Sequence, residues 1–400
     1  MNRKQLVIIL IAGIVLGGAG FLLNGKKSAS FERTQKSATG TLLGDFPVND
    51  VVHISVRHGS NEVNLVKGEV WTVRERDGYP ASASQIIEFA RKLVDLRAAQ
   101  SQKIGESQLG RLNLLDPAKD GTNSATLVEL KGKDDKVIRS VRLGKESMRD
   151  SGGPMGGGGW PNGRWIYIPD QPGVAYLSSE SFANIEPKPE EWLEKDFVHV
   201  EKARSVDVVF PVATNSWKLT RETETGEWKL ADAKPDETVD ASKIASVSNP
   251  LSAPTFVDVR TGAALEGTGS NAPVVVTIDT FDNFHYVARV GAKANDDYPI
   301  TVAVSAQVAK ERTPGKDEKP EDKAKLDKEF KERQDKLEQK LKKEQAFGKW
   351  TYMVSSWSLE PLIKHRSELI TNPSNTNSVS SVQPQIEDPP LPLPTTPGPH

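Results

Sequence analysis

The stretch GEVWTVRERDGYPASASQIIEFARKLVDL, from Gly68 to Leu96, decides the fold because the chain carries it twice. Its apolar residues first alternate, as in a half-buried strand, and then recur at helical spacing after a run with serines. The stretch GEWKLADAKPDETVDASKIASVSNPL, from Gly226 to Leu251, repeats this order, with Trp228 in the place of Trp71. The repetition predicts two related domains, in which the paired tryptophans belong to the cores.

Segments around each copy follow in the same order. VVHISVR (51–57) corresponds to SVDVVFP (205–211), and the predicted hairpin at 126–144 has the same length as that at 273–291. WTYMV at the start of 350–370 resembles WIYIP in the first copy. The predicted fold class is α+β: two tandem related domains of antiparallel sheet, made of meanders and hairpins and each covered by an amphipathic helix, plus an N-terminal transmembrane helix.

Composition shifts give the domain boundaries. We expect a transmembrane anchor, a tether, a first α+β repeat domain, a second repeat domain with a charged helical insertion, and a Pro-rich disordered tail. Their ranges are 1–23, 24–44, 45–198, 199–370 with the insertion at 310–346, and 371–400.

The N-terminus predicts a membrane location. Residues 6–23 are apolar and uncharged, long enough to cross a bilayer as a helix and in contact with membrane lipid. Arg3 and Lys4 favour the cytoplasmic side, which would place the bulk of the chain in the periplasm or outside, on a single pass through a bacterial inner membrane. A cleaved signal peptide stays an alternative.

Two insertions distinguish the copies. The glycine-rich segment 151–163 leads into a strand and lacks the lysine and helix of a phosphate-binding loop, so it predicts a surface loop. In the segment 310–346, Leu326, Phe330, Leu337 and Leu341 form a narrow apolar stripe on a charged helix. This helix is expected either to pack on a partner as a coiled coil or to protrude.

No catalytic, cofactor-binding or metal-binding residue can be named from the sequence. The chain has no cysteine, and its six histidines are scattered without a pair at metal-binding spacing. His53 and His285 lie in predicted strands and are interpreted as packed or surface residues. The net charge of −2 gives no general attraction for nucleic acid. We therefore expect no enzyme, no cofactor and no nucleic-acid partner, with any small ligand unknown.

The anchor, VVHISV, the WTVRE segment, LNLLDP leading into ATLVEL, VRLGK and WIYI together resemble the bacterial domain-of-unknown-function family 4340. Members of that family are often encoded beside ABC-transporter and gliding-motility-type auxiliary components. The resemblance implies an extracytoplasmic auxiliary subunit.

Two functions remain open. The first is a non-catalytic, membrane-anchored scaffold or binding subunit that contacts membrane proteins such as transporter permease subunits. The alternative is an envelope carbohydrate-binding protein or hydrolase that uses a groove between the two domains.

Overall fold

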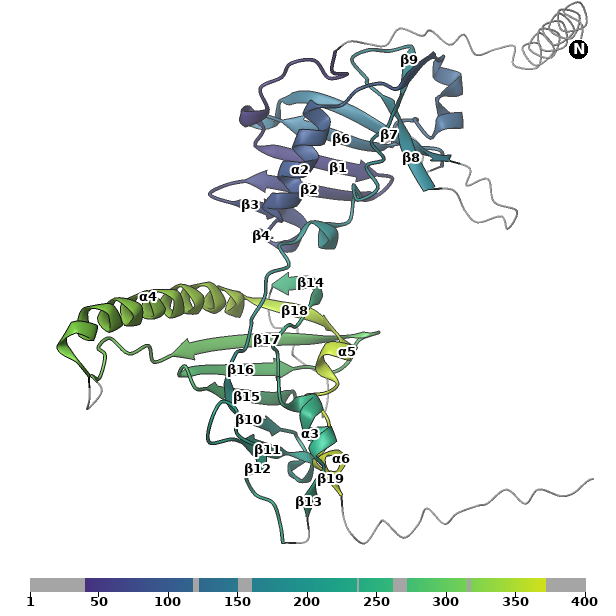
Figure 1. The fold of residues 1–400 in the computed structure, drawn as a ribbon. Coiled ribbons are helices and arrows are strands. Elements are labelled where there is room, and N and C mark those ends of the chain that lie inside the picture. Colours follow the sequence, from purple (N-terminus) through teal and green to yellow (C-terminus); the bar gives the residue numbers. More distant parts are fainter. Residues whose placement is uncertain are drawn as a thin grey trace, which may run out of the picture. The chain divides into compact units, whose positions relative to one another are not determined.

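A computed structural model describes residues 40–117, 122–149, 160–235, 237–261, 272–314 and 318–371. These residues form two compact units of mixed α+β structure with antiparallel sheets (Figure 1). Unit 1 holds the described residues up to Asp196 together with the strand β14 (Phe256–Thr261), and unit 2 holds the rest from Phe197 onward. β14 is at the same time the edge strand of the sheet whose other strands belong to unit 2.

The sheet of unit 1 runs in the order β4-β3-β2-β1-β6-β7-β8-β9-β5. Alternation sets its inner face, because Ile54 and Val56 of β1 are buried and stand opposite Leu130 and Val128 of β6. The strands are β1 (His53–His58), β2 (Asn61–Lys67), β3 (Trp71–Val73), β4 (Tyr79–Pro80), β5 (Gln100–Lys103), β6 (Thr126–Lys131), β7 (Val137–Arg149), β8 (Trp160–Tyr167) and β9 (Val174–Ser178).

The helix α2 (Ala83–Val94) closes the core of unit 1 with one face, on which Ile86, Phe89 and Leu93 are buried. The ring of Phe89 packs edge-on against Trp192, a fully buried indole whose nitrogen donates to a backbone carbonyl. Ile87, by contrast, is 67% exposed because it lies on the solvent side of the helix.

Unit 1 begins earlier than the sequence predicts. Leu42 and Leu43, assigned to the tether, are buried, and the backbone N–H of Leu42 donates to the carbonyl of Leu96. Arg139 of β7 donates to the carbonyl of Leu43 and fixes the same segment. The last part of the predicted tether is therefore part of the domain.

The eight-stranded sheet that holds the strands of unit 2 runs in the order β12-β11-β10-β15-β16-β17-β18-β14, and β13 forms a separate pair with β19. Val206 and Val208 of β10 are buried, as are their neighbours on β15. The strands are β10 (Ala203–Val209), β11 (Trp217–Thr220), β12 (Lys229–Leu230), β13 (Thr238–Val239), β15 (Val274–Thr280), β16 (Phe284–Val290), β17 (Asp297–Ala306), β18 (Trp350–Ser355) and β19 (Ile370–Thr371).

Short helices complete unit 2. The helix α3 (Ala241–Val247) begins at Asp240, whose carboxylate accepts from the backbone of Ser242 and Lys243. Two single-turn helices, α5 (Ser356–Leu359) and α6 (Arg366–Leu369), follow β18. Ile244 is buried in α3 as Ile86 is in α2.

The paired tryptophans occupy corresponding places in the two sheets. Trp71 lies two residues before Val73, which pairs with β2, and Trp228 lies two residues before Leu230, which pairs with β11. Both indoles are half-buried, so the prediction that they belong to the cores is wrong. Among the side chains that the structure describes, the fully buried indoles are those of Trp192 and Trp217.

Several sequence predictions lie outside the described residues. These are the membrane anchor at 1–23, the glycine-rich stretch up to residue 159 and the Pro-rich tail beyond residue 371. Within the described ranges, none of the helices combines the length and apolar character required to span a bilayer.

Candidate functional site

The helix α4 (Pro320–Gln345) is attached to unit 2 at its C-terminal end. There Glu344, 3% exposed, accepts hydrogen bonds from the hydroxyl of Tyr286 at 2.7 Å and from the backbone N–H of His199 at 3.0 Å. Burial raises the pKa of Glu344 and outweighs the hydrogen bonds that lower it. The C-terminal end of α4 is thus attached by the carboxylate of Glu344, whose oxygens accept hydrogen bonds from other residues of unit 2.

Ion pairs continue this attachment along the helix. Lys340 donates to Glu201 and to the carbonyl of His199, both at 2.7 Å, and Arg333 pairs with Asp282 in the turn between β15 and β16. The apolar stripe of α4 is half-buried, and the helix contacts β17 of its own unit. Much of the apolar stripe that could have formed a coiled coil with a partner therefore packs within unit 2.

The outward side of α4 is charged and exposed. Lys325 pairs with Glu329 and Lys328 with Glu332, each one turn apart. These side chains are 58% to 78% exposed. Such pairs contribute about 0.3–0.5 kcal/mol each to the helix. This side of α4 therefore presents charges of both signs to solvent.

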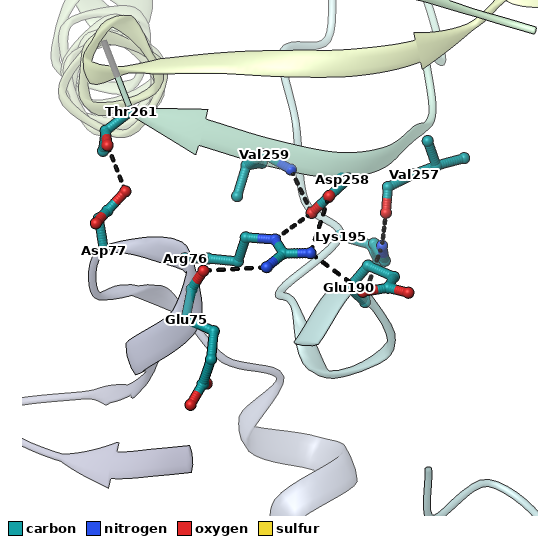
Figure 2. A network of polar contacts seen from close by, with 9 residues as sticks. All are labelled: Glu75, Arg76, Asp77, Glu190, Lys195, Val257, Asp258, Val259 and Thr261. Atoms are coloured by element: carbon teal, nitrogen blue, oxygen red, sulfur yellow. Dashed lines mark hydrogen bonds and ion pairs between the residues drawn. The ribbon is translucent and has the colours of Figure 1, made fainter. Parts of the chain in front are cut away.

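A polar network binds β14 to the rest of unit 1 (Figure 2). The guanidinium of Arg76 donates to both carboxylate oxygens of Asp258, at 2.6 and 3.0 Å, and to Glu190 at 3.2 Å. Arg76 and Asp258 are about one-fifth exposed, so water screens the pair only partly. This two-pronged geometry suits the planar guanidinium and specifies the position of β14.

Contacts on either side of Arg76 extend the network. Lys195 donates to the carbonyl of Val257 at 3.0 Å, and its ammonium lies 5.0 Å from the ring of Phe256. Asp77 accepts from the hydroxyl of Thr261. Burial lowers the pKa of Lys195 more than the neighbouring carboxylates raise it. Three residues of β14 are thus held by separate polar side chains, and no sequence pattern in the repeat predicts this.

A row of polar residues crosses the sheet of unit 2 opposite its core. Ser205, Asp279, His285 and Ser305 stand directly across from one another on β10, β15, β16 and β17. Asp279 accepts from Ser205 and from Nδ1 of His285, each at 2.8 Å. The sequence interpretation left this pair out. Positions three residues before and after the predicted tip at Asp282 could have indicated it, since such residues face each other in a hairpin.

In unit 1 the residue at the start of the corresponding row is buried. His53 precedes Ile54 as Ser205 precedes Val206, so it takes the place of Ser205 and not that of Asp207, which the aligned sequences suggest. It is 5% exposed, and its ring nitrogens lie 2.7 Å from Asp135 and 2.7 Å from Asn64. The amide of Asn64 donates to Glu75, so its oxygen faces the histidine. The hydrogen bond with His53 lowers the pKa of Asp135. His53 is therefore fully engaged in a structural network.

Among the described residues, no group of three histidine, aspartate or glutamate side chains could hold a metal ion. Ser205 and His285 both bond to Asp279, an order in which the histidine cannot take a proton from the serine.

A family model described as Domain of unknown function (DUF4340) matches residues 71–273, just over half of the chain. The chain belongs to this family. The matched span of the DUF4340 chain includes α2, α3, Arg76 and β14. Neither the curated proteins nor the solved structures provide a match.

Proposed function

We propose that this DUF4340 chain is a membrane-anchored, extracytoplasmic scaffold or binding subunit without catalytic activity. It is auxiliary to an ABC-type transport or cell-envelope complex, on a single N-terminal span at residues 6–23 of a bacterial inner membrane. In this proposal the chain consists of two tandem related domains, and the common strand order of the two sheets supports their relation.

The observation that carries the proposal is α4. A helix with a charged outer side is secured to its unit by buried Glu344 and by Lys340, which keeps the pattern of exposed charges in a fixed orientation. Electrostatic complementarity of this kind selects partners and increases association rates. Membrane proteins such as permease subunits are the partners that we propose.

Site-specific photo-crosslinking in cells tests the proposal. The crosslinker is placed at exposed Lys328 on α4 and, as a matched control, at exposed Asp170 in the turn between β8 and β9 of unit 1. We expect adducts with integral membrane proteins from position 328 and not from position 170. Equal adducts from both positions, or none from α4, would contradict the proposal.

A charge-swapped helix sharpens this test. Exchanging the partners of one ion pair, as Lys328→Glu with Glu332→Lys, keeps opposite charges one turn apart and changes helix stability by only about 0.5 kcal/mol. The crosslink from neighbouring Lys336 should weaken if the charge pattern is recognised. An unchanged adduct would show that these charges do not select the partner. The hydrolase alternative predicts turnover of envelope glycans by the purified chain, which the scaffold function does not.

A further inference from the structure

Unit 2 contains a cavity of about 490 Å³ at the ends of β10, β15, β16 and β17. This volume lies within the roughly 300–1,000 Å³ of small-molecule sites. Its wall includes Asp279 and His285 of the polar row and the side chain of Arg204. The cavity is independent of the outer side of α4, on which the proposed scaffold function depends.

An irregularity in β10 brings Arg204 to this place. The register between β10 and β15 shifts between Ala203 and Ser205, so Arg204 is the extra residue of a bulge. Bulges redirect a side chain from the regular alternation and are frequent beside functional sites. Within the described part of the chain, no protein hydrogen bond or ion pair is found for the Arg204 guanidinium, which is exposed.

The acidic group in the cavity is already satisfied. Burial raises the pKa of Asp279, but the hydrogen bonds with His285 and Ser205 and the nearby charge of Arg204 outweigh burial and lower it. Asp279 is therefore ionised at neutral pH, and Nδ1 of His285 carries the proton that it donates. The other ring nitrogen of His285 is left for a hydrogen bond with a ligand hydroxyl.

The remaining wall supplies groups that pair with hydroxyls. Asn283, Ser305 and Gln307 contribute two amides and a hydroxyl, each able to donate and to accept. Phe284 is 3% exposed, so its ring offers no face for stacking on a neutral sugar. A phosphate dianion is poorly matched, because the single guanidinium of Arg204 would have to balance two negative charges while it stands close to the carboxylate of Asp279. The best match is a ligand that carries one carboxylate and several hydroxyls.

We propose that this cavity binds a small polyhydroxylated monocarboxylate of the hexuronic acid class. Arg204 pairs with the ligand carboxylate, and His285, oriented by Asp279, forms a hydrogen bond with a ligand hydroxyl, while Asn283 and Gln307 bind the other hydroxyls. Neither the sequence interpretation nor the family match assigns a ligand to this place.

Calorimetric titration of the purified full-length chain tests the site with D-glucuronate, D-galacturonate, D-glucose and glucose 6-phosphate as probes. A uronate should bind saturably and at least tenfold more tightly than glucose. Arg204→Gln should remove this preference. Arg289→Gln, at an exposed position on the same face of β16 outside the cavity, should leave it unchanged.

A second variant separates misfolding from loss of the site. His285→Asn should weaken uronate and glucose binding by a similar factor, because both ligands share the hydroxyl contact, with the exchange protection of β15 and β16 retained. The proposal is overturned if neither uronate binds saturably, if Arg204→Gln binds the uronate as tightly as the parent chain, or if glucose 6-phosphate binds more tightly than both uronates.

Discussion

Unit 1 and unit 2 order their corresponding strands alike but connect one hairpin differently. In unit 1, residues 168–173 join β8 to β9, whereas in unit 2, residues 307–349 join β17 to β18 and contain α4. The entropic cost of closing a loop grows slowly with its length, so the sheet tolerates the insertion. The buried carboxylate of Glu344 then fixes the end of the insertion. The comparison shows that a surface was added to unit 2 without a change in strand order.

The cores differ as well. Trp217 in unit 2 stands at the position of Val63 in unit 1, since both lie opposite equivalent valines of the first strand. Unit 1 instead fills its core with Trp192, which comes from its C-terminal segment. Each buried indole donates to a backbone carbonyl, of Glu186 or of Lys364. A buried indole therefore fills the core of each unit, but the two indoles come from different places in the repeat.

The largest expected effect comes from a substitution in the core of unit 2. Trp217→Val gives unit 2 the residue that unit 1 has there, and it should destabilise unit 2 by about 3–5 kcal/mol through the cavity that it leaves. Hydrogen exchange in a urea series, assigned to peptides of each unit, measures the loss. The reverse change, Val63→Trp, should overpack unit 1. A mild effect of Trp217→Val would mean that the two cores are more alike than their packing indicates.

Removing the attachment of α4 comes next. Glu344→Ala leaves the hydroxyl of Tyr286 and the N–H of His199 without their acceptor, at a cost of about 3 kcal/mol. Exchange should rise in α4 and β18 and stay constant in unit 1. Glu338→Ala, an exposed change on the same helix, is the matched control. Equal effects of the two substitutions would show that Glu344 is not the attachment.

The pKa of Glu344 adds a pH dependence with a definite sign. Because burial raises this pKa above its ordinary value of 4.5, the folded state holds the proton more tightly than the unfolded state. The stability from this group is complete below pH 4.5 and is lost as the pH rises through the folded pKa. Glu344→Gln should flatten that slope in urea unfolding between pH 4 and pH 7.

The pH dependence expected from Glu237 has the opposite sign. The hydrogen bond from Arg366 lowers the pKa of Glu237 to about 2, so its contribution to stability is lost in acid.

A smaller effect is expected for β14. Arg76→Met should cost about 2 kcal/mol, between the values for buried and exposed pairs, because both partners are about one-fifth exposed. Exchange in residues 256–261 should increase first. The exposed Arg74 of the same short helix provides the control substitution, Arg74→Met. Unchanged protection of β14 in Arg76→Met would assign its attachment to apolar contacts such as Tyr79 with Phe256.

The smallest expected effect concerns the residues that first indicated the repeat. Trp228 is half-buried and stacks on the guanidinium of Arg221 at 4.7 Å, an interaction of about 0.5–1 kcal/mol. Trp228→Leu and Trp71→Leu should each lower stability by about 1 kcal/mol, measured by thermal unfolding. A loss of stability as large as that expected for Trp217→Val would show that both tryptophans act as core residues.

Sequence predicted the repeat better than its exact register. The hairpins at 126–144 and 273–291 have equal length, which suggests a gapless alignment. However, Leu130 pairs with Ile54 where Ile278 pairs with Val206, and a bulge in β7, in which Ile138 is the extra residue, absorbs the difference of one residue. Spacing alone does not reveal such a bulge, because the apolar alternation continues on both sides.

The last hairpin was misassigned for a related reason. WTYMV resembles WIYIP, but Ile166 of β8 and Ile300 of β17 take equivalent places, and Tyr352 of β18 corresponds to Tyr176 of β9. Similar letters reflect the general preference of strands for aromatic and β-branched residues. The cavity and the Arg76 network could not be predicted, since both depend on contacts between segments far apart in the chain.

The position of β14 has a consequence for synthesis. The strand β14, which Arg76 binds through Asp258, is made by the ribosome only after residues 197–255, so the N-terminal part of unit 1 emerges first without it. At roughly 5–20 residues per second this delay lasts several seconds. During that time Arg76, Asp77 and Lys195 lack their partners on β14, which are Asp258, Thr261 and the carbonyl of Val257. The polar contacts of β14 with Arg76, Asp77 and Lys195 can therefore form only after residues 197–255 have been translated.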